Sequence, residues 1–141
     1  MDKAVREHAP GLILHLGDYE LDARVLAKTF PHLPIRSVRG NCDFRSKAPV
    51  LDDFIVAGKR IIMTHGHRYD VKSDYTALCN MGRAEGADIL LFGHTHIPYY
   101  EQLGTMHVLN PGSAAYTCGL IQITDGGICC QHVSLSVYAD L

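Results

Sequence analysis

The sequence lacks the features that would assign it to a membrane or a nucleic acid. It has no apolar run long enough to span a bilayer, and its first residues lack the apolar core of a signal peptide. It also has no run rich in lysine or arginine, and its formal net charge is −2. Such a chain carries no electrostatic footprint for nucleic acid or for an anionic membrane surface. We therefore expect a cytoplasmic protein that binds neither.

The cysteines lack the pattern of a bonded or metal-binding set. There are five, which is an odd number, two of them are adjacent (Cys129 and Cys130), and none belongs to a C-x-x-C pair. Neither a disulfide framework nor a thiolate zinc site is indicated. What the sequence does contain, 141 residues with 47% hydrophobic and 20% charged content, suits one globular domain over residues 1–141 with a substantial core.

Apolar patterns predict an α/β chain. Apolar residues at helical spacing, followed by turn residues, predict helices over 2–8, 21–29 and 74–85, the last ending at Gly86. Apolar or alternating runs predict strands over 12–16, 35–38, 54–56, 60–64, 89–92, 106–109, 120–124 and 128–137. The segments 54–56 and 60–64 form a hairpin about Ala57-Gly58-Lys59. The last three strands are expected to have one exposed face.

Polar side chains that can bind metals follow four of these apolar runs. They stand beside glycine in Gly17-Asp18, Gly40-Asn41, His65-Gly66 and Gly93-His94-Thr95-His96. Sites in open α/β sheets form beyond the carboxyl ends of the strands, so we expect these motifs to converge. An extended backbone would point His94 and His96 to one side and Thr95 to the other. Two surface histidines on a loop are the alternative interpretation.

The chemistry of these side chains indicates the kind of metal. One aspartate, one asparagine and three or four histidines form a mixed oxygen and nitrogen set that suits Mn, Fe, Zn, Ni or Co and is too rich in nitrogen for calcium. Because a carboxylate has two oxygens, Asp18 could bridge two metals. His15, inside an apolar run, is expected to be a buried, hydrogen-bonded residue. The histidines outside the motifs are expected to be ordinary surface or structural residues: His8, His32, His107 and His132.

Taken in order, the motifs resemble those of the calcineurin-like metallophosphoesterases, and more closely the small prokaryotic phosphodiesterases among them. The matching residues extend from 12 to 113 and comprise Gly17-Asp18, Gly40-Asn41-Cys42-Asp43, Thr64-His65-Gly66-His67, Gly93-His94-Thr95-His96 and Asn110-Pro111-Gly112-Ser113. The resemblance implies a four-layer αββα sandwich of two mixed sheets, with a dinuclear metal site at the strand ends. The ligands that it implies are Asp18, bridging both metals, Asn41, His65 and His94 at one metal, and His96 at the other.

The resemblance also implies roles around the metals. His67 and Asn41 would contact the substrate phosphate as catalytic residues. Asp43 would orient a metal-binding imidazole, and the turn at 110–113 would support the site. Where many relatives have a histidine that protonates the leaving group, this chain has Cys42, a poorer acid. We therefore expect a preference for good leaving groups, or proton donation by His67.

One motif of the family does not occur in this sequence. The family begins with a strand that ends in Asp-x-His and supplies two ligands to the first metal, and no Asp-x-His is present here. We expect that the start of the protein, and with it the first strand of the fold, is missing from this sequence; a natural short form is the alternative. The chain as it stands is then expected to hold one metal, or two loosely, and to expose a sheet edge through which it could form a homo-oligomer.

The function expected from these residues is metal-dependent hydrolysis of small phosphodiesters. The cofactor would be one or two divalent transition metals per chain, Mn first, with Fe, Zn or Ni as alternatives. Two other functions are compatible with the resemblance: a scaffold of low or no activity that acts through protein contacts, like the retromer subunit of similar fold, and a metal storage or sensing domain. The presence of Asn41, His65, His94 and His96 favours the enzyme, because a scaffold needs none of these residues.

Overall fold

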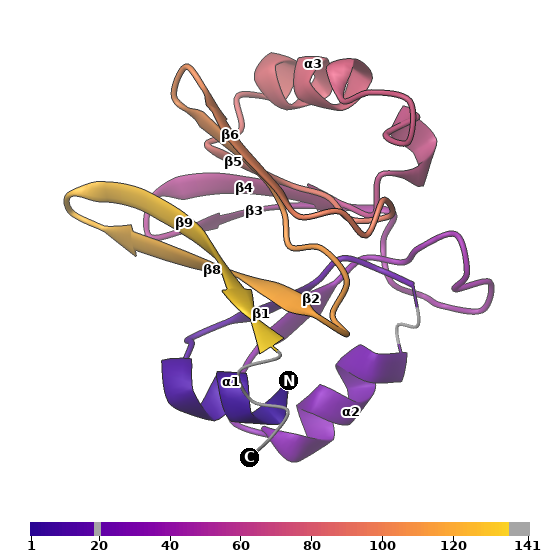
Figure 1. Cartoon of the computed structure of the whole chain (residues 1–141), viewed down its shortest axis with the longest axis vertical. Coiled ribbons are helices and arrows are strands. Elements are labelled where there is room, and N and C mark those ends of the chain that lie inside the picture. Colours follow the sequence, from indigo (N-terminus) through magenta and orange to yellow (C-terminus); the bar gives the residue numbers. More distant parts are fainter. Residues whose placement is uncertain (19–20, 136–141) are drawn as a thin grey trace.

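The computed structural model describes residues 1–18 and 21–135, which form four stacked layers. Figure 1 shows one helix on the outer face of a large sheet, two helices on the opposite side of the molecule, and shorter strands in between. The helices are α1 (Asp2–His8), α2 (Leu21–Thr29) and α3 (Thr76–Glu85), and a 3-10 turn, η1, spans His67–Tyr69. The predicted α/β class is confirmed, with helices outside and strands inside.

The large sheet is mixed and has five strands in the order β3-β4-β5-β7-β6. Its central strands β4, β5 and β7 are parallel, and each edge strand runs antiparallel to its neighbour. The carboxyl ends of the parallel strands therefore meet at one edge of the sheet. The bounds are β3 (Leu51–Val56), β4 (Lys59–Thr64), β5 (Ile89–Leu91), β6 (Tyr99–Leu103) and β7 (Met106–Asn110).

The core lies on both faces of this sheet. On the face covered by α3, Ile62 belongs to a buried cluster with Leu78 and Phe92. On the other face, Ile61 and Met63 belong to a second cluster, so neighbouring residues of one strand enter different cores. Each such side chain stabilises the fold by about 1.5–3 kcal/mol when fully buried. All five residues of β7 are buried, so the predicted exposed face at 106–109 is wrong: this strand is central and covered on both sides.

The third layer consists of two separate ribbons. β1 (Ile13–His15) pairs in parallel with β2 (Ile35–Ser37), and β8 (Thr117–Thr124) pairs antiparallel with β9 (Gly127–Ser134). Among the described residues each of these strands has its only ladder partner inside its own ribbon. The second mixed sheet expected from the family resemblance is therefore present as a parallel and an antiparallel pair.

Several helix and strand ends predicted from turn residues agree with the structure. α1 and α2 have the predicted bounds, and α3 ends at Gly86 in the left-handed conformation (φ 75°), as the sequence predicts, although it starts two residues later. The β3–β4 turn contains two residues instead of three, Ala57 and Gly58, both with positive φ. The strand β6 was not predicted by periodicity, because this edge strand exposes most of its residues and has no apolar alternation.

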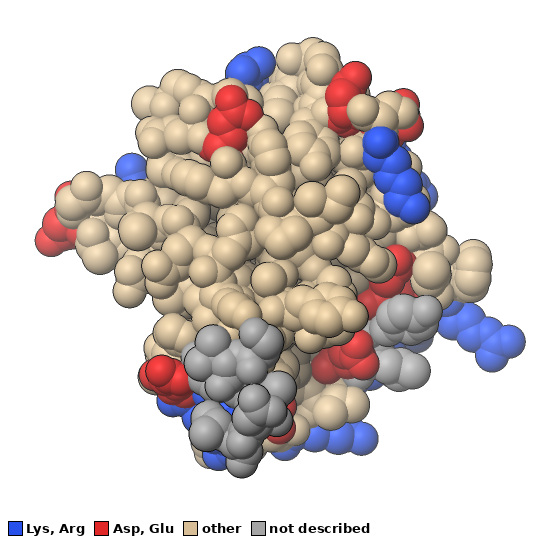
Figure 2. Space-filling view, in the orientation of Figure 1, with Lys and Arg blue, Asp and Glu red and all other residues tan. Residues whose placement is uncertain are grey.

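Charged side chains lie mainly around the rim of the face shown in Figure 2, and the middle of that face is uncharged. The ribbon of β8 and β9 runs through this area, and neither strand contains lysine, arginine, aspartate or glutamate. None of the described helices has both the length and the apolar character needed to cross a membrane.

Candidate metal centre

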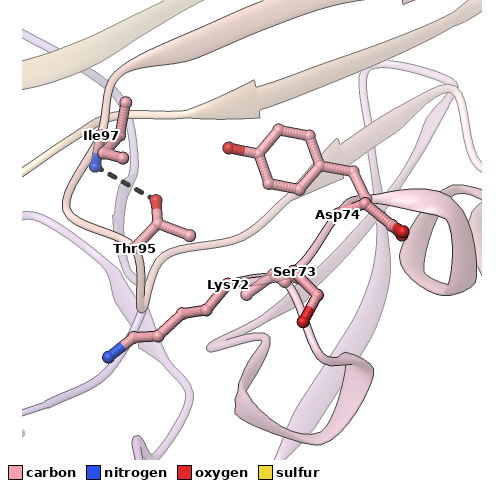
Figure 3. Close-up of a pocket in the computed structure, with 7 residues that line it drawn as sticks. Lys72, Ser73, Asp74, Thr95 and Ile97 are labelled. Carbon is pink, nitrogen blue, oxygen red and sulfur yellow. Dashed lines mark hydrogen bonds between the residues drawn. The ribbon is translucent and has the colours of Figure 1, made fainter.

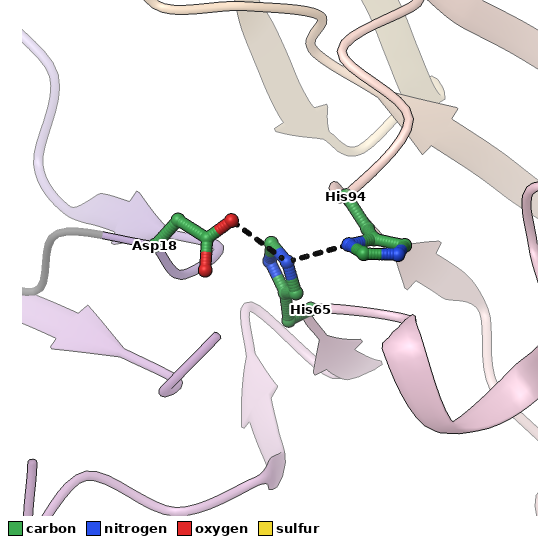
Figure 4. A group of neighbouring side chains, drawn as sticks. All are labelled: Asp18, His65 and His94. Atoms are coloured by element: carbon green, nitrogen blue, oxygen red, sulfur yellow. Dashed lines mark hydrogen bonds and ion pairs between the residues drawn. The ribbon is translucent and has the colours of Figure 1, made fainter. Parts of the chain in front are cut away.

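Three side chains from distant parts of the sequence meet at the ends of strands β1, β4 and β5 (Figure 4). The ligand atoms of Asp18, His65 and His94 all lie within 4.8 Å of one another. His65 is central: its Nε2 atom is 3.3 Å from Oδ2 of Asp18 and 3.1 Å from Nδ1 of His94. Asn41, from the loop after β2, places its Oδ1 atom 3.0 Å from the same nitrogen. The predicted convergence of the four motifs is thus present in the fold.

The tautomer of His65 follows from a backbone contact. Its Nδ1 atom lies 2.8 Å from the carbonyl oxygen of Leu16. A carbonyl can only accept a hydrogen bond, so Nδ1 carries the proton, and in the neutral ring Nε2 presents a lone pair to the group. The lone pairs of Nε2 and the oxygens of Asp18 and Asn41 then point at one another, which is unfavourable unless a cation lies among them. A divalent metal satisfies these donors together, and the residues present therefore fit such an ion.

The histidines around His65 are held neutral, which is the form that binds metals. Burial lowers the pKa of His94, and the neighbouring His65 and Lys72 act in the same direction. Burial likewise lowers the pKa of His67, again with His65 and nearby Arg68 acting in the same direction. The Nδ1 atom of His67 is buried without a hydrogen-bond partner, and its ring centre is 5.4 Å from that of His65. A buried nitrogen without a partner beside the ligand group marks a place where a bound molecule could form a hydrogen bond.

Two glycines let the loops that carry Asp18 and Asn41 approach each other. A Cβ atom added at Gly40 would lie 2.2 Å from Oδ1 of Asp18, and one added at Gly17 would lie 2.7 Å from the Gly40 nitrogen. Gly17 also has a φ of 97°, a conformation that side chains rarely adopt. The carboxylate of Asp18 is held in this space by the backbone N–H of Cys42, which donates to Oδ1 at 2.9 Å. Glycine is therefore required at both positions for the carboxylate to reach His65.

The predicted geometry of His94 and His96 is wrong. Both residues have positive φ, 66° and 61°, so the backbone turns at each of them instead of continuing the extended strand. His94 turns into the ligand group, whereas His96 is exposed and lies outside the group of Asp18, His65 and His94. Two-residue alternation, which would have placed both imidazoles on one side, applies only to extended backbone.

A buried asparagine holds this turn in place. The side chain of Asn110 is fully buried, and its Nδ2 donates to the carbonyl of Gly93 at 3.1 Å and to Oγ1 of Thr95 at 2.9 Å. Its Oδ1 accepts the N–H of Gly112 at 2.9 Å. Asn110 thus fixes the residues on both sides of His94, which agrees with the supporting role expected for the turn at 110–113.

The two remaining residues of the asparagine loop, Asp43 and Cys42, have different surroundings in this structure. The carboxylate of Asp43 accepts the N–H of Gly40 at 2.8 Å, which shapes the loop that presents Asn41. The group that orients His65 is instead the Leu16 carbonyl, which no side-chain motif could reveal. The side chain of Cys42 is exposed. Partial desolvation and the charges of Asp18 and Asp43 raise the pKa of its thiol, which makes it a weaker acid for a departing alkoxide.

The histidines outside the motifs have structural contacts or surface positions. His15 is half-buried and its Nδ1 accepts the N–H of Gly17 at 3.3 Å. His107 is buried with its Nδ1 2.6 Å from the Tyr100 hydroxyl, and Nε2 of His132 donates to the Asn110 carbonyl at 2.7 Å. His15 is therefore hydrogen-bonded as predicted, although only half-buried.

Comparison with known proteins identifies the family. The model of the calcineurin-like phosphoesterase superfamily domain matches residues 1–126. The chain belongs to this superfamily. Among relatives, the probable metallophosphoesterase YsnB of Bacillus subtilis is 38% identical over 104 residues, which are 72% of this chain and 58% of that protein. Phosphodiesterase YfcE of Escherichia coli is 31% identical over 91 residues, 59% of this chain and 46% of that protein. This superfamily member thus spans less than two thirds of the length of these relatives.

Solved structures show the same superfamily fold. A conserved Streptococcus pneumoniae protein, a predicted phosphoesterase, superposes with a TM-score of 0.66 at 26% identity, covering 94% of this chain and 86% of that chain. A single mutant of Vps29 from Entamoeba histolytica superposes with a TM-score of 0.68 at 23% identity, covering 88% and 82% of the two chains. The second likeness concerns the fold alone.

Proposed function

We propose that this chain is a metal-dependent phosphoesterase that hydrolyses small phosphodiesters. The observation that supports it most strongly is the convergence of Asp18, Asn41 and His94 on Nε2 of His65, a nitrogen left with a free lone pair in the neutral ring, in a member of the calcineurin-like phosphoesterase superfamily. Relatives named metallophosphoesterase or phosphodiesterase agree with it. Mn is the metal that we propose first, with Fe, Zn and Ni as alternatives, because imidazole with carboxylate and amide oxygen suits each of them.

The four donors would hold one metal ion, in agreement with the expectation of a single site or two loose ones. When bound, such an ion lowers the pKa of water and neutralises charge on a phosphate. The protein's own contribution is to fix the donors before the ion arrives. The Leu16 carbonyl orients His65, the Cys42 N–H orients Asp18, and Asn110 fixes the turn at His94. His96, exposed in this structure, could bind a second ion only if further ligands came from elsewhere.

His67 is the residue that we propose to contact the substrate. Its ring lies 6.2 Å from that of His94, between centres, and its Nδ1 atom is buried without a partner. A protonated Nδ1 can donate to a phosphate oxygen, and the lowered pKa keeps the other ring nitrogen free of a second proton near neutral pH. Asn41 would act beside it, since its amide N–H can orient the phosphate while its oxygen faces the metal. With Cys42 exposed and weakly acidic, esters with good leaving groups should react best.

The test is hydrolysis of bis-p-nitrophenyl phosphate with and without added Mn²⁺. We expect turnover that depends on the metal and that falls at least about a hundredfold in His65→Ala, because the central ligand is lost. The matched control is His32→Ala, which changes an exposed histidine outside the group. Absence of turnover in the wild-type chain, both alone and extended at its start, would refute the proposal.

The scaffold alternative predicts a different result. Vps29 structures share this fold, and one of them is a complex with Zn²⁺. A protein that acts only through contacts with other proteins does not depend on hydrolysis at such a metal site. A scaffold would retain its fold and stability in His65→Ala and would hydrolyse no diester. A metal storage or sensing domain would bind Mn²⁺ tightly and likewise hydrolyse nothing, so metal binding measured beside turnover separates all three functions.

A further inference from the structure

A solvent-open cavity of about 560 Å³ lies between two segments of the chain, 71–75 and 95–97 (Figure 3). It is bordered by the segment 71–75, which follows η1 and its His67, and by Thr95 and Ile97, which flank His96. Thr95 directly follows His94 in the chain. The cavity therefore opens between the segments that carry a proposed ligand and the proposed phosphate contact. Its volume is within the range of sites for small organic molecules.

The walls of this cavity are apolar where a ring could pack. Val71 is buried, and Tyr75 is fixed by edge-to-face packing against Phe92 and Tyr99, with ring centres 4.8 Å and 4.6 Å apart. Ile97 is 60% exposed, an unusual position for a large aliphatic side chain. Its backbone N–H is bound to Oγ1 of Thr95 at 3.1 Å, so the turn that presents it is ordered (Figure 3).

Most polar groups of the cavity already have partners. Oδ1 of Asp74 accepts the N–H of Thr76 at 2.9 Å, and Oγ of Ser73 donates to Asp70 at 3.1 Å. Lys72 differs, because in the part of the chain that the structure describes its ammonium group forms no ion pair or hydrogen bond. Its positive charge contributes to the lowered pKa of His94 and partly offsets the raised pKa of Cys42, so the ammonium group acts on the metal centre. Among the described residues that line the cavity, Lys72 is the one cation, and it is available to an anionic ligand.

We propose that this cavity binds the flat ring of an ester group, aryl or nucleobase, on the substrate phosphate, with Lys72 contacting the phosphate and Ile97 and Tyr75 enclosing the ring. The inference rests on the proposed function and narrows it to phosphodiesters that carry such a ring. A flat ring can pack against apolar walls and a rigid aromatic side chain. A highly charged or polyol group would lose its hydration against these walls without gaining hydrogen bonds from them.

The test is binding of three probes, measured by calorimetry in the presence of Mn²⁺: inorganic phosphate, phenyl phosphate and thymidine 5′-monophosphate. We expect the wild-type chain to bind at least one ring-bearing probe more tightly than inorganic phosphate. If phenyl phosphate binds more tightly than thymidine 5′-monophosphate, the group is an aryl ring, and if the order is reversed, it is a nucleoside. Ile97→Ser should weaken ring-bearing probes about three- to tenfold and leave phosphate unchanged, because it removes only apolar contact. Lys72→Gln should weaken all three probes. Ile55→Ser, which alters another exposed isoleucine on edge strand β3, is the matched control.

The outcomes separate this inference from the proposed function, because binding does not require turnover. Equal affinity for phosphate and both ring-bearing probes, or an Ile97→Ser effect no larger than that of Ile55→Ser, would overturn the ring site even if bis-p-nitrophenyl phosphate is hydrolysed. Ring preference that depends on Ile97, in a chain that hydrolyses no diester, would support the ring site and refute the phosphodiesterase. Both isoleucines are exposed, so neither serine variant removes buried core.

Discussion

The Nε2 atom of His65 lies 3.1 Å from the Nδ1 atom of His94, and these residues follow two adjacent parallel strands, β4 and β5. The opposite nitrogen of His65 is bound to the backbone carbonyl of Leu16, just beyond β1. The imidazole that forms the centre of the ligand group is therefore oriented by the other β layer of the molecule. Metal affinity should depend on how these two layers pack as well as on the ligands themselves.

Replacing His94 or His96 by alanine should affect Mn²⁺ affinity differently, although only Thr95 separates the two residues. His94→Ala removes a nitrogen from the ligand group and should weaken Mn²⁺ binding at least about tenfold. His96→Ala changes an exposed side chain outside the group and should leave the affinity within error. Calorimetric titration of each variant measures this. Equal losses in the two variants would show that His96 is a ligand in solution.

A methyl group at Gly40 should displace the carboxylate of Asp18. Its carbon would lie 2.2 Å from Oδ1 and 2.3 Å from the backbone nitrogen of Asp18, so the loop must move. We expect Gly40→Ala to destabilise the metal-free protein by about 1–3 kcal/mol and to weaken Mn²⁺ binding as well. Urea unfolding and metal titration provide the two measurements.

Gly11→Ala is the control for this change, because no atom lies within 4 Å of an added Cβ there and the backbone φ is not positive. It should preserve both stability and affinity. If Gly40→Ala bound Mn²⁺ as tightly as Gly11→Ala does, Asp18 would not be part of the metal site.

Replacing Asn110 by alanine should loosen the turn that presents His94. The change leaves the Gly112 N–H without its partner and removes one of the two hydrogen bonds that the Gly93 carbonyl accepts, at a cost of about 1–3 kcal/mol in the free energy of unfolding. Metal affinity should fall too, although Asn110 touches no metal. Asn80→Ala, at an exposed position of α3, should change neither quantity. A stable Asn110→Ala variant with reduced affinity would still support the positioning role, whereas unchanged affinity in a destabilised one would contradict it.

The ion pair of Asp53 and Arg60 should give stability a defined pH dependence. Hydrogen bonds from Arg60 lower the pKa of Asp53 below its ordinary value of 3.8; burial opposes this shift, and the charge of Arg60 reinforces it. The unfolded chain therefore takes up the proton at a higher pH than the folded one. The stabilisation is complete above the ordinary pKa and is lost as the pH falls through the lowered value.

Urea unfolding of the wild-type protein and Asp53→Asn between about pH 6 and pH 3 measures this contribution. The wild-type protein should be the more stable at the upper end, and the difference should shrink toward the lower end as the carboxyl becomes protonated. A difference that stays constant over the whole range would show that the pair, 2.6 Å apart between Nη2 and Oδ2, adds no charge-dependent stability.

The sequence predicts the strand ends of the site well, because apolar runs buried on both faces and the glycines that follow them are local signals. Runs such as 60–64 and 89–92 stop where β4 and β5 stop, within one residue, and Asp18, Asn41, His65 and His94 follow as expected. The layered arrangement came from the family resemblance and not from periodicity. Edge strand β6 shows why: with most residues exposed, it has no apolar alternation to detect.

The features that the sequence did not reveal depend on backbone geometry. Strand alternation predicts that His94 and His96 point to the same side, but their positive φ values point them apart. No residue type in Gly93-His94-Thr95-His96 predicts these backbone turns. The partner of His65 is a carbonyl, which every residue has, so Leu16 carries no side-chain signal. The contact of Gly40 with Asp18 joins two loops 22 positions apart and appears only once β1 and β2 are paired.

The most direct measurement of where Mn²⁺ binds is anomalous X-ray scattering from crystals grown with the ion. We predict one strong anomalous peak within coordination distance of Oδ2 of Asp18, Nε2 of His65 and Nδ1 of His94, and its loss in crystals of His65→Ala. Either of two results would contradict a metal site at His65. The first is a peak beside His96 and away from these residues, and the second is no peak at His65 in crystals grown with Mn²⁺.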